Sequence, residues 1–291
     1  MLALAFLLQA ATAPPQARGD VVVRGQRIEE REASRQIDRI LPPTAVDQPL
    51  ARFQTTVCPG VMGLAPGSAQ AIVDRIGMVA DTLGLRVGEP GCAANLLLVV
   101  TDDADAAIRR LAARGRGMFH TLSLADLRRV TAEAGAARGW SETEVRSRDG
   151  ERQTMAEYDD ILPPTSRFGG MAPQLLVPTA SRIALGFRRD ISRSYVIIDA
   201  AAVRGRDTTQ IADYVAMRGL AGIRPDRERG AFTILAAFTA NDATAPPALT
   251  DVDWGILHGL YSGQGNRPSG LKRSEMIRNI LHPDTKQRDH P

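Results

Sequence analysis

Apolar positions follow two patterns in the first half of the chain, one typical of helices and one of a buried strand. After Ser68, a good helix N-cap, apolar residues recur at helical spacing and Gly84 supplies a stop. Residues 95–101 follow, with five consecutive apolar residues from Leu96, a pattern typical of a strand buried on both faces. Asp103 and Ser123 are placed to cap two further helices. This order predicts an α/β (α+β) fold with a single main domain.

The second half contains shorter strand patterns and one long loop. Residues 143–146 can form a strand that turns at 149–150, and residues 182–187 and 195–199 can form two strands around a polar turn at 188–192. Residues 157–173 are rich in Pro, Gly and Asp, so we expect a loop that can lie over a cleft.

The clearest helix spans residues 207–218. Asp207 with Gln210 three residues later fits an acidic capping box, and Gly219 stands where a C′ glycine belongs. Ala212, Ala216 and Gly219 share a face that is small enough for another element to pack closely. A second helix is expected over residues 251–261, with His258 between its apolar positions.

The N-terminus predicts export. An apolar run from Leu2 to Ala11, too short to span a bilayer, leads to Ala11-Thr12-Ala13, so we expect a signal peptide over residues 1–13. The remaining boundaries are a leader with a short helix and a Pro-rich linker (14–49), the main domain (50–281) and a disordered tail (282–291). We therefore expect a periplasmic or secreted protein whose mature chain has no transmembrane segment.

Export bears on the redox state of the two cysteines. An oxidising compartment would let Cys58 and Cys92 form a disulfide, and their spacing does not match a zinc ribbon or a CxxC redox motif. The net charge of +3 comes from arginines interleaved with acids, and only 4% of the residues are aromatic. Interleaved signs and few stacking side chains argue against nucleic-acid binding.

Several short motifs resemble those of zincin-type metallopeptidases. Around the 207–218 helix, the order of a strand, a loop, a helix and a Gly-Leu pair is similar to the active-site helix region of that class. The likeness is to a family of exported bacterial zincin-like domains of unknown function, and the whole chain resembles exported alphaproteobacterial proteins. The resemblance covers about residues 50–280 and rests on these segments: Leu83-Gly84-Leu85, Ala94-Asn95-Leu96, Val196-Ile197-Ile198-Asp199, Gly219-Leu220, Leu249-Thr250-Asp251-Val252-Asp253 and Leu260-Tyr261.

The resemblance implies a zincin-like mixed sheet packed with helices, but the metal motif HExxH is absent. In register with Gly219, the ligand positions are Ala212, Ala216 and Gly222, none of which supplies a side-chain ligand. Asp213 keeps a carboxylate at the general-base position, where a solvated or Arg-paired helix residue is the simpler interpretation. We therefore expect no metal and no cofactor.

These observations favour a non-catalytic binding or structural module of the periplasm or cell envelope, with an envelope protein or peptide as its partner. The alternative is a hydrolase whose active site is assembled from distant residues. Its candidate catalytic residues are Asp213, His120 and His258.

Overall fold

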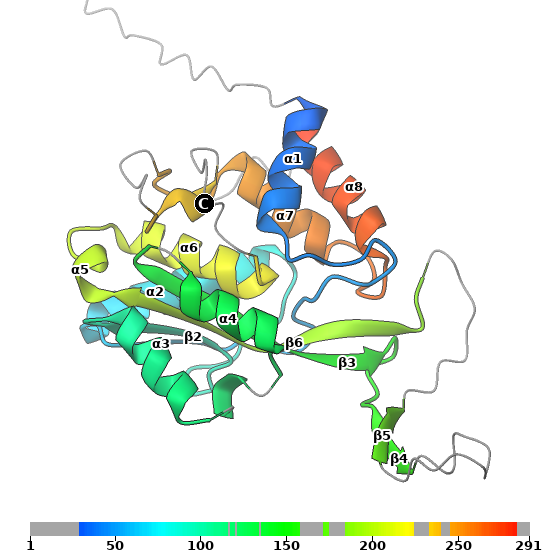
Figure 1. Ribbon diagram of the computed structural model, residues 1–291. Helices are drawn as coiled ribbons and strands as arrows, with labels where there is room; N and C mark the ends of the chain where they lie inside the picture. Colours follow the sequence, from blue (N-terminus) through cyan, green and yellow to red (C-terminus); the bar gives the residue numbers. More distant parts are fainter. Residues whose placement is uncertain are drawn as a thin grey trace, which may run out of the picture.

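Four strands form a mixed central sheet in the order β1-β2-β6-β3 (Figure 1). Strands β1, β2 and β6 run parallel, and β3 lies antiparallel to β6 at one edge. This computed structural model describes residues 29–115, 117–119, 121–133, 135–157, 171–174, 184–223, 233–239 and 245–283. The strands are β1 (Pro59–Met62), β2 (Leu96–Thr101), β3 (Ala137–Ser147) and β6 (Phe187–Asp199), with a separate pair β4 (Thr154–Glu157) and β5 (Met171–Gln174).

Helices cover both faces of the sheet, so the predicted mixed α/β class is confirmed. The larger core lies on the face covered by α2 and α6, with α1, α7 and α8 packed beyond them. A smaller core on the other face joins α3 and α4 to the aromatic stack of Phe119, Trp140 and Tyr195. The helices are α1 (Glu30–Ile40), α2 (Pro66–Thr82), α3 (Ala104–Ala113), α4 (Leu124–Ala132), α5 (Ala200–Val203), α6 (Thr208–Ala221), α7 (Asp251–Tyr261) and α8 (Ser269–Leu281), with single turns η1 (Gly117–Phe119) and η3 (Ile234–Ala236).

Local capping explains where several helices begin. The Asp103 carboxylate accepts a hydrogen bond from Ala106 N at 2.7 Å, and Ser123 Oγ accepts one from Asp126 N at 3.0 Å. Helix α2 differs from its prediction, because it begins at Pro66 and the N-cap, Ala65, makes no side-chain hydrogen bond. Proline at the first helical position replaces the expected Ser68 cap, since its fixed φ already suits a helix.

The predicted polar turn at residues 188–192 is wrong, because β6 runs without a break from Phe187 to Asp199. Residues 187–191 of β6 pair with residues 143–147 of β3. Strand β2 does not extend along this part of β6, because it pairs with residues 194–199. In this ribbon the polar residues find partners across the strands, because Arg189 donates to Thr143 Oγ1 at 3.5 Å and Asp190 lies 3.7 Å from Arg146 Nε. Tertiary pairing therefore overrides the local turn signal.

The segment assigned to the leader also contributes to the core. Helix α1 buries Ala33, Ile37 and Ile40. It packs against α8, and the sequence patterns did not predict helix α8 (Figure 1). An ion pair of 3.2 Å between Arg273 and Asp38 joins the two helices. The proposed signal peptide, the rest of the leader to residue 28 and the tail beyond 283 lie outside the described residues.

The predicted disulfide between Cys58 and Cys92 is present, with its Cα atoms 6.1 Å apart. It ties the start of β1 to the loop before β2, and it spans a sequence separation of 34 residues. Over the ranges given above, no helix is long and apolar enough to span a bilayer.

Candidate functional site

Helix α6 packs against one face of the sheet and, with its C-cap Gly222, carries the positions that correspond to the zincin metal motif. Its N-cap, Asp207, accepts a hydrogen bond from Thr209 N at 2.6 Å. The helix ends at Ala221, three residues later than expected, because Gly222 rather than Gly219 adopts the left-handed cap conformation, with φ of 59°. Residues 211–221 are all buried, so this is a core helix rather than a surface one.

The small face of α6 packs into the larger core. Ala212 and Ala216 are both fully buried. A Cβ atom on Gly219 would lie only 2.9 Å from Cγ of Leu96 on β2, so glycine permits this close approach of helix and sheet. Gly222 lies past the end of the helix, beside Ser141 of β3. These four positions therefore form a packing surface and a helix terminus.

Asp213 is buried in the core and paired with Arg75. Its carboxylate accepts hydrogen bonds from Arg75 Nε at 2.8 Å, Arg75 Nη2 at 3.0 Å and Leu249 N at 2.8 Å. The Arg-paired interpretation thus describes Asp213, although the side chain is shielded from solvent. Its contacts join α6 to α2 and to the segment before α7.

His258 lies on α7, with its ring 5.6 Å from that of Trp254. It lines a cavity together with Tyr261 and Glu275, and Asp213 is not part of that lining. His120 lies outside the described residues. Within the part of the chain that the structure describes, no group of three or more His, Cys, Asp or Glu side chains could hold a metal ion.

A second buried carboxylate, Asp253, caps α7. It forms a capping box with Thr250 and also accepts a hydrogen bond from Ile234 N at 2.9 Å through Oδ2. Complete burial, together with the nearby Asp213, raises the pKa of Asp253 to about 7, against the opposing effect of these hydrogen bonds. The resemblance includes this acid only as part of a sequence motif, and the structure shows it as a structural cap.

The polar centre of α6 is Arg218, a role that the sequence patterns did not predict. Its guanidinium donates to both carboxylate oxygens of Glu133, at 2.7 and 3.2 Å, and to the Tyr214 hydroxyl at 3.0 Å. It also donates to the Gly139 carbonyl at 3.2 Å, in the space that a Cβ on Gly139 would fill. Burial alone would lower the pKa of Arg218, but Glu133 and Tyr214 hold it above its ordinary value. An arginine in an apolar helix face was the signal for this pair.

A cleft opens beside this ion pair, along the outer side of β3. Its volume is about 130 Å³, below the roughly 300 Å³ of a typical small-molecule pocket, so it has room for a single side chain. The loop after α1, the start of α4, the end of α6 and strand β3 form its walls. Those walls include Leu41, Leu50, Leu122, Gly139, Ser141, Thr143, Arg189, Ile191, Arg218 and Ile223.

Strand β3 directs the backbone groups of every second residue away from β6 and towards this cleft, and of these the Gly139 carbonyl accepts from Arg218. Among the described residues its only neighbour in the sheet is β6. Backbone groups of successive residues in a strand point to opposite sides. Along β6, Asp199 N donates to the Ala136 carbonyl on the β3 side. Ser194 N donates instead to Asn95 O on the β2 side. The residues opposite Val196 and Ser194, which are Gly139 and Ser141, therefore direct their backbone groups outward.

The register shift between Glu142 and Thr143 places one extra residue, Ser192, in β6 and leaves the alternation along β3 unchanged, so Thr143 also faces outward. Thr143 lies opposite Ile191, whose N–H donates to Arg52 O on the far side of β6. Gly139, Ser141 and Thr143 thus form one row of outward-facing backbone groups, and all three line the cleft. We call this row the β3 edge.

Comparisons with protein-family models, with curated proteins and with solved structures find no match to this chain.

Proposed function

We propose that this chain is an exported, non-catalytic, zincin-like module that binds an extended segment of an envelope protein or peptide at the β3 edge. The observation that carries the proposal is the row of outward-facing backbone groups at Gly139, Ser141 and Thr143 beside a pocket sized for one side chain. An added strand would pair with these groups, and the pocket would select one of its side chains.

The arrangement of the fold supports the zincin-like part of this proposal. An antiparallel edge strand borders the cleft, and a buried helix follows β6 and runs beneath the sheet. The positions where that class carries zinc ligands hold Ala212, Ala216 and Gly222, which supports a binding role over hydrolysis. The Cys58–Cys92 disulfide supports an oxidising compartment.

The pocket walls suggest what the bound segment contains. Leucine and isoleucine side chains form much of the wall, while Arg189 adds a positive charge at the same opening. We therefore expect an extended peptide with one apolar anchor residue and an acidic residue near it.

A selection from random linear peptides displayed on phage, followed by calorimetry with the enriched peptides, tests the proposal. Proline at an edge position removes an outward N–H without breaking the ladder to β6, so Ser141→Pro should weaken binding at least about tenfold. The matched control, Ser141→Ala, removes only the hydroxyl that contacts Ser194 at 2.7 Å and should bind within about twofold of the parent.

Two results would overturn the proposal. Equal peptide binding by the Ser141→Pro and Ser141→Ala variants would show that the β3 edge is not the site. Elemental analysis of untagged protein exported to a periplasm gives the second test: one zinc per chain that survives dialysis would reject the metal-free assignment.

A further inference from the structure

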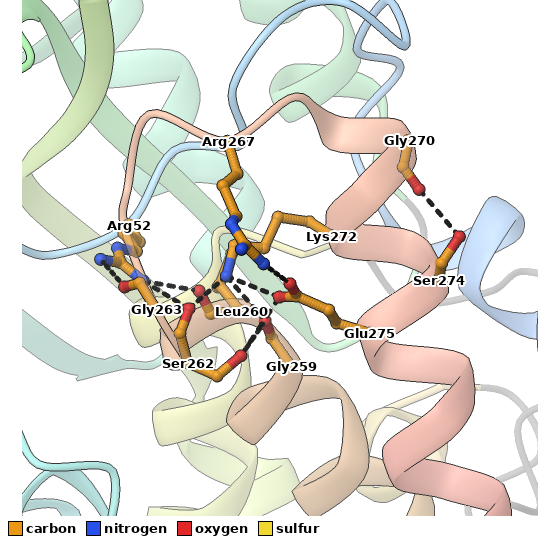
Figure 2. Close-up of polar contacts among 10 residues, drawn as sticks. All are labelled: Arg52, Gly259, Leu260, Ser262, Gly263, Arg267, Gly270, Lys272, Ser274 and Glu275. Atoms are coloured by element: carbon orange, nitrogen blue, oxygen red, sulfur yellow. Dashed lines mark hydrogen bonds and ion pairs between the residues drawn. The ribbon is translucent and has the colours of Figure 1, made fainter. Parts of the chain in front are cut away.

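The end of α7 is held by an unusual concentration of positive side chains (Figure 2). Lys272 of α8 donates to the carbonyls of Gly259 and Ser262 and to the Glu275 carboxylate, and Arg267 pairs with that same carboxylate. Arg52 donates to Leu260 O and Gly263 O, each at 2.9 Å. The carbonyls at the end of a helix carry partial negative charge, which explains why cations gather there.

Arg52 is the cation of this group that lacks a carboxylate partner. It is 7% exposed, and the described residues place no acidic oxygen within ion-pair distance of it. Its Nη atoms face neutral carbonyls, while its Nε–H is buried without a hydrogen-bond acceptor. Leaving a charged donor buried and unsatisfied costs free energy, so such a group in a folded protein calls for an acceptor.

A cavity of about 430 Å³ lies beside Arg52. Gln54 and Arg188 line it on one side, and the turn at Arg148 and Asp149 and the loop of residues 264–266 complete it. Two hydrogen bonds fix that loop to the start of β6, because Leu185 N donates to Asn266 O at 2.9 Å and Asn266 Nδ2 donates to Leu185 O at 2.6 Å.

The charges around the cavity leave a positive surplus. Arg188 is neutralised by Asp190, at 2.9 Å, and Arg148 has only a loose, exposed pair with Asp149, at 3.3 Å. Arg52 remains uncompensated, and the side-chain amides of Gln54 and Gln264 add neutral donors to the lining. This lining is rich in donors, which suits a ligand that supplies acceptors and negative charge.

Gly265 lets the Gln54 amide lie close to Arg52. A Cβ atom at this position would overlap Nε2 of Gln54 and would lie 3.0 Å from Nε of Arg52. The glycine does not have a positive φ, so close approach rather than backbone conformation explains it. The Gln54 amide occupies the space that a side chain here would need, and that space lies beside Arg52 Nε.

We propose that this cavity, the Arg52 cavity, binds a small organic oxyanion that bears a carboxylate or phosphate group. One anionic oxygen would accept from Arg52 Nε–H, and the Gln54 amide and the Arg148 guanidinium would bind the others. The planar arginine fork matches both carboxylate and phosphate oxygens, so the two share one recognition chemistry. The site is separate from the β3 edge, and its argument does not depend on the proposed peptide binding.

Calorimetric titration of the full chain with inorganic phosphate and with succinate, against chloride at equal ionic strength, tests this site. We expect saturable binding of at least one oxyanion and none of chloride. Arg148→Gln should weaken that binding about tenfold, because one charge-assisted hydrogen bond is lost. The matched control is Arg35→Gln, which removes a charge of similar exposure that pairs only with Glu32 on α1 and should leave the affinity within about twofold.

Gly265→Ala displaces the Gln54 amide from its place beside Arg52 without changing any charge and should abolish binding. Should that variant fail to fold, Gln54→Glu places a negative charge in the lining and should abolish binding as well. Binding of phosphate alone identifies a phosphate-bearing ligand, and binding of succinate alone a carboxylate. Absence of binding by both anions, or equal losses in Arg148→Gln and Arg35→Gln, would overturn the proposal.

Discussion

Arg218 and Glu133 form an ion pair inside the protein, with 2.7 Å between Nη1 and Oε1, although 85 residues separate them in the chain. Their side chains are 1% and 8% exposed. The pair joins α6 to the segment that precedes β3. It therefore holds the helix against the strand whose edge forms the candidate site.

Removal of one partner should therefore be costly. Glu133→Gln leaves the Arg218 charge buried without its counter-ion, and we expect a loss of about 3–5 kcal/mol in the free energy of unfolding. Chemical denaturation measures this loss. Glu32→Gln, at the exposed Arg35 pair, is the control and should cost about 0–1 kcal/mol. Similar small losses in both variants would contradict the structural role of the buried pair.

Ala216 leaves no room for a larger side chain. It is fully buried on the small face of α6, so Ala216→Leu should lower the free energy of unfolding by roughly 1–3 kcal/mol through overpacking. Ala71→Leu, at an exposed position of α2, provides the comparison and should change stability by about 0.5 kcal/mol or less. An unchanged denaturation midpoint for Ala216→Leu would argue against close packing there.

Asp253 should give the fold a specific dependence on pH. Its pKa is raised to about 7 in the folded protein, from 3.8, so the folded state holds a proton that the unfolded state has released. Its contribution to stability is therefore complete below pH 3.8 and is lost as pH rises through about 7.

Asp253→Asn removes this titration, so the stability of the parent relative to this variant should fall between pH 4 and 7 by up to about 1.4 kcal/mol per pH unit. Urea denaturation of both proteins across this range measures the difference. A constant difference would mean that Asp253 stays ionised throughout.

The Cys58–Cys92 disulfide should be a major stabilising element. The two cysteines are 34 positions apart in the chain, and closing a loop of that size corresponds to roughly 4 kcal/mol in the chain-entropy model, so the Cys58→Ser/Cys92→Ser protein should lose about that much stability. A thiol assay on the denatured, unreduced parent should find no free thiols. Two thiols per chain would show that the disulfide does not form.

The features of the fold that the sequence predicted correctly depend on interactions between residues close together in the chain. The caps at Asp103, Ser123 and Asp207 each satisfy backbone N–H groups within three residues, so the pattern and the structure agree. The turn expected at residues 188–192 failed because those polar residues are satisfied by β3, which is distant in sequence. Helix α8 was missed since its burial depends on α1 and α7.

The candidate site was less predictable than the fold. The sequence directed attention to Ala212, Asp213 and Ala216, which prove to be packed or paired in the core. The β3 edge is a property of backbone direction and strand order, and no single residue type signals it. Arg52 gave no signal either, because its missing partner is visible only once the α7 terminus and the loop at Gly265 are in place.

The Lys272 network has a consequence for chemical labelling. Of the 36 basic residues in the chain only Lys272 and Lys286 are lysines. Lys272 is 2% exposed, and its ammonium group donates to Gly259, Ser262 and Glu275. An amine-directed reagent should therefore spare this lysine in the native protein, and a lysine-specific protease should not cleave after it. Modification or cleavage at Lys272 would then report, in a single mass-spectrometric peak, the local opening of α8 from α7.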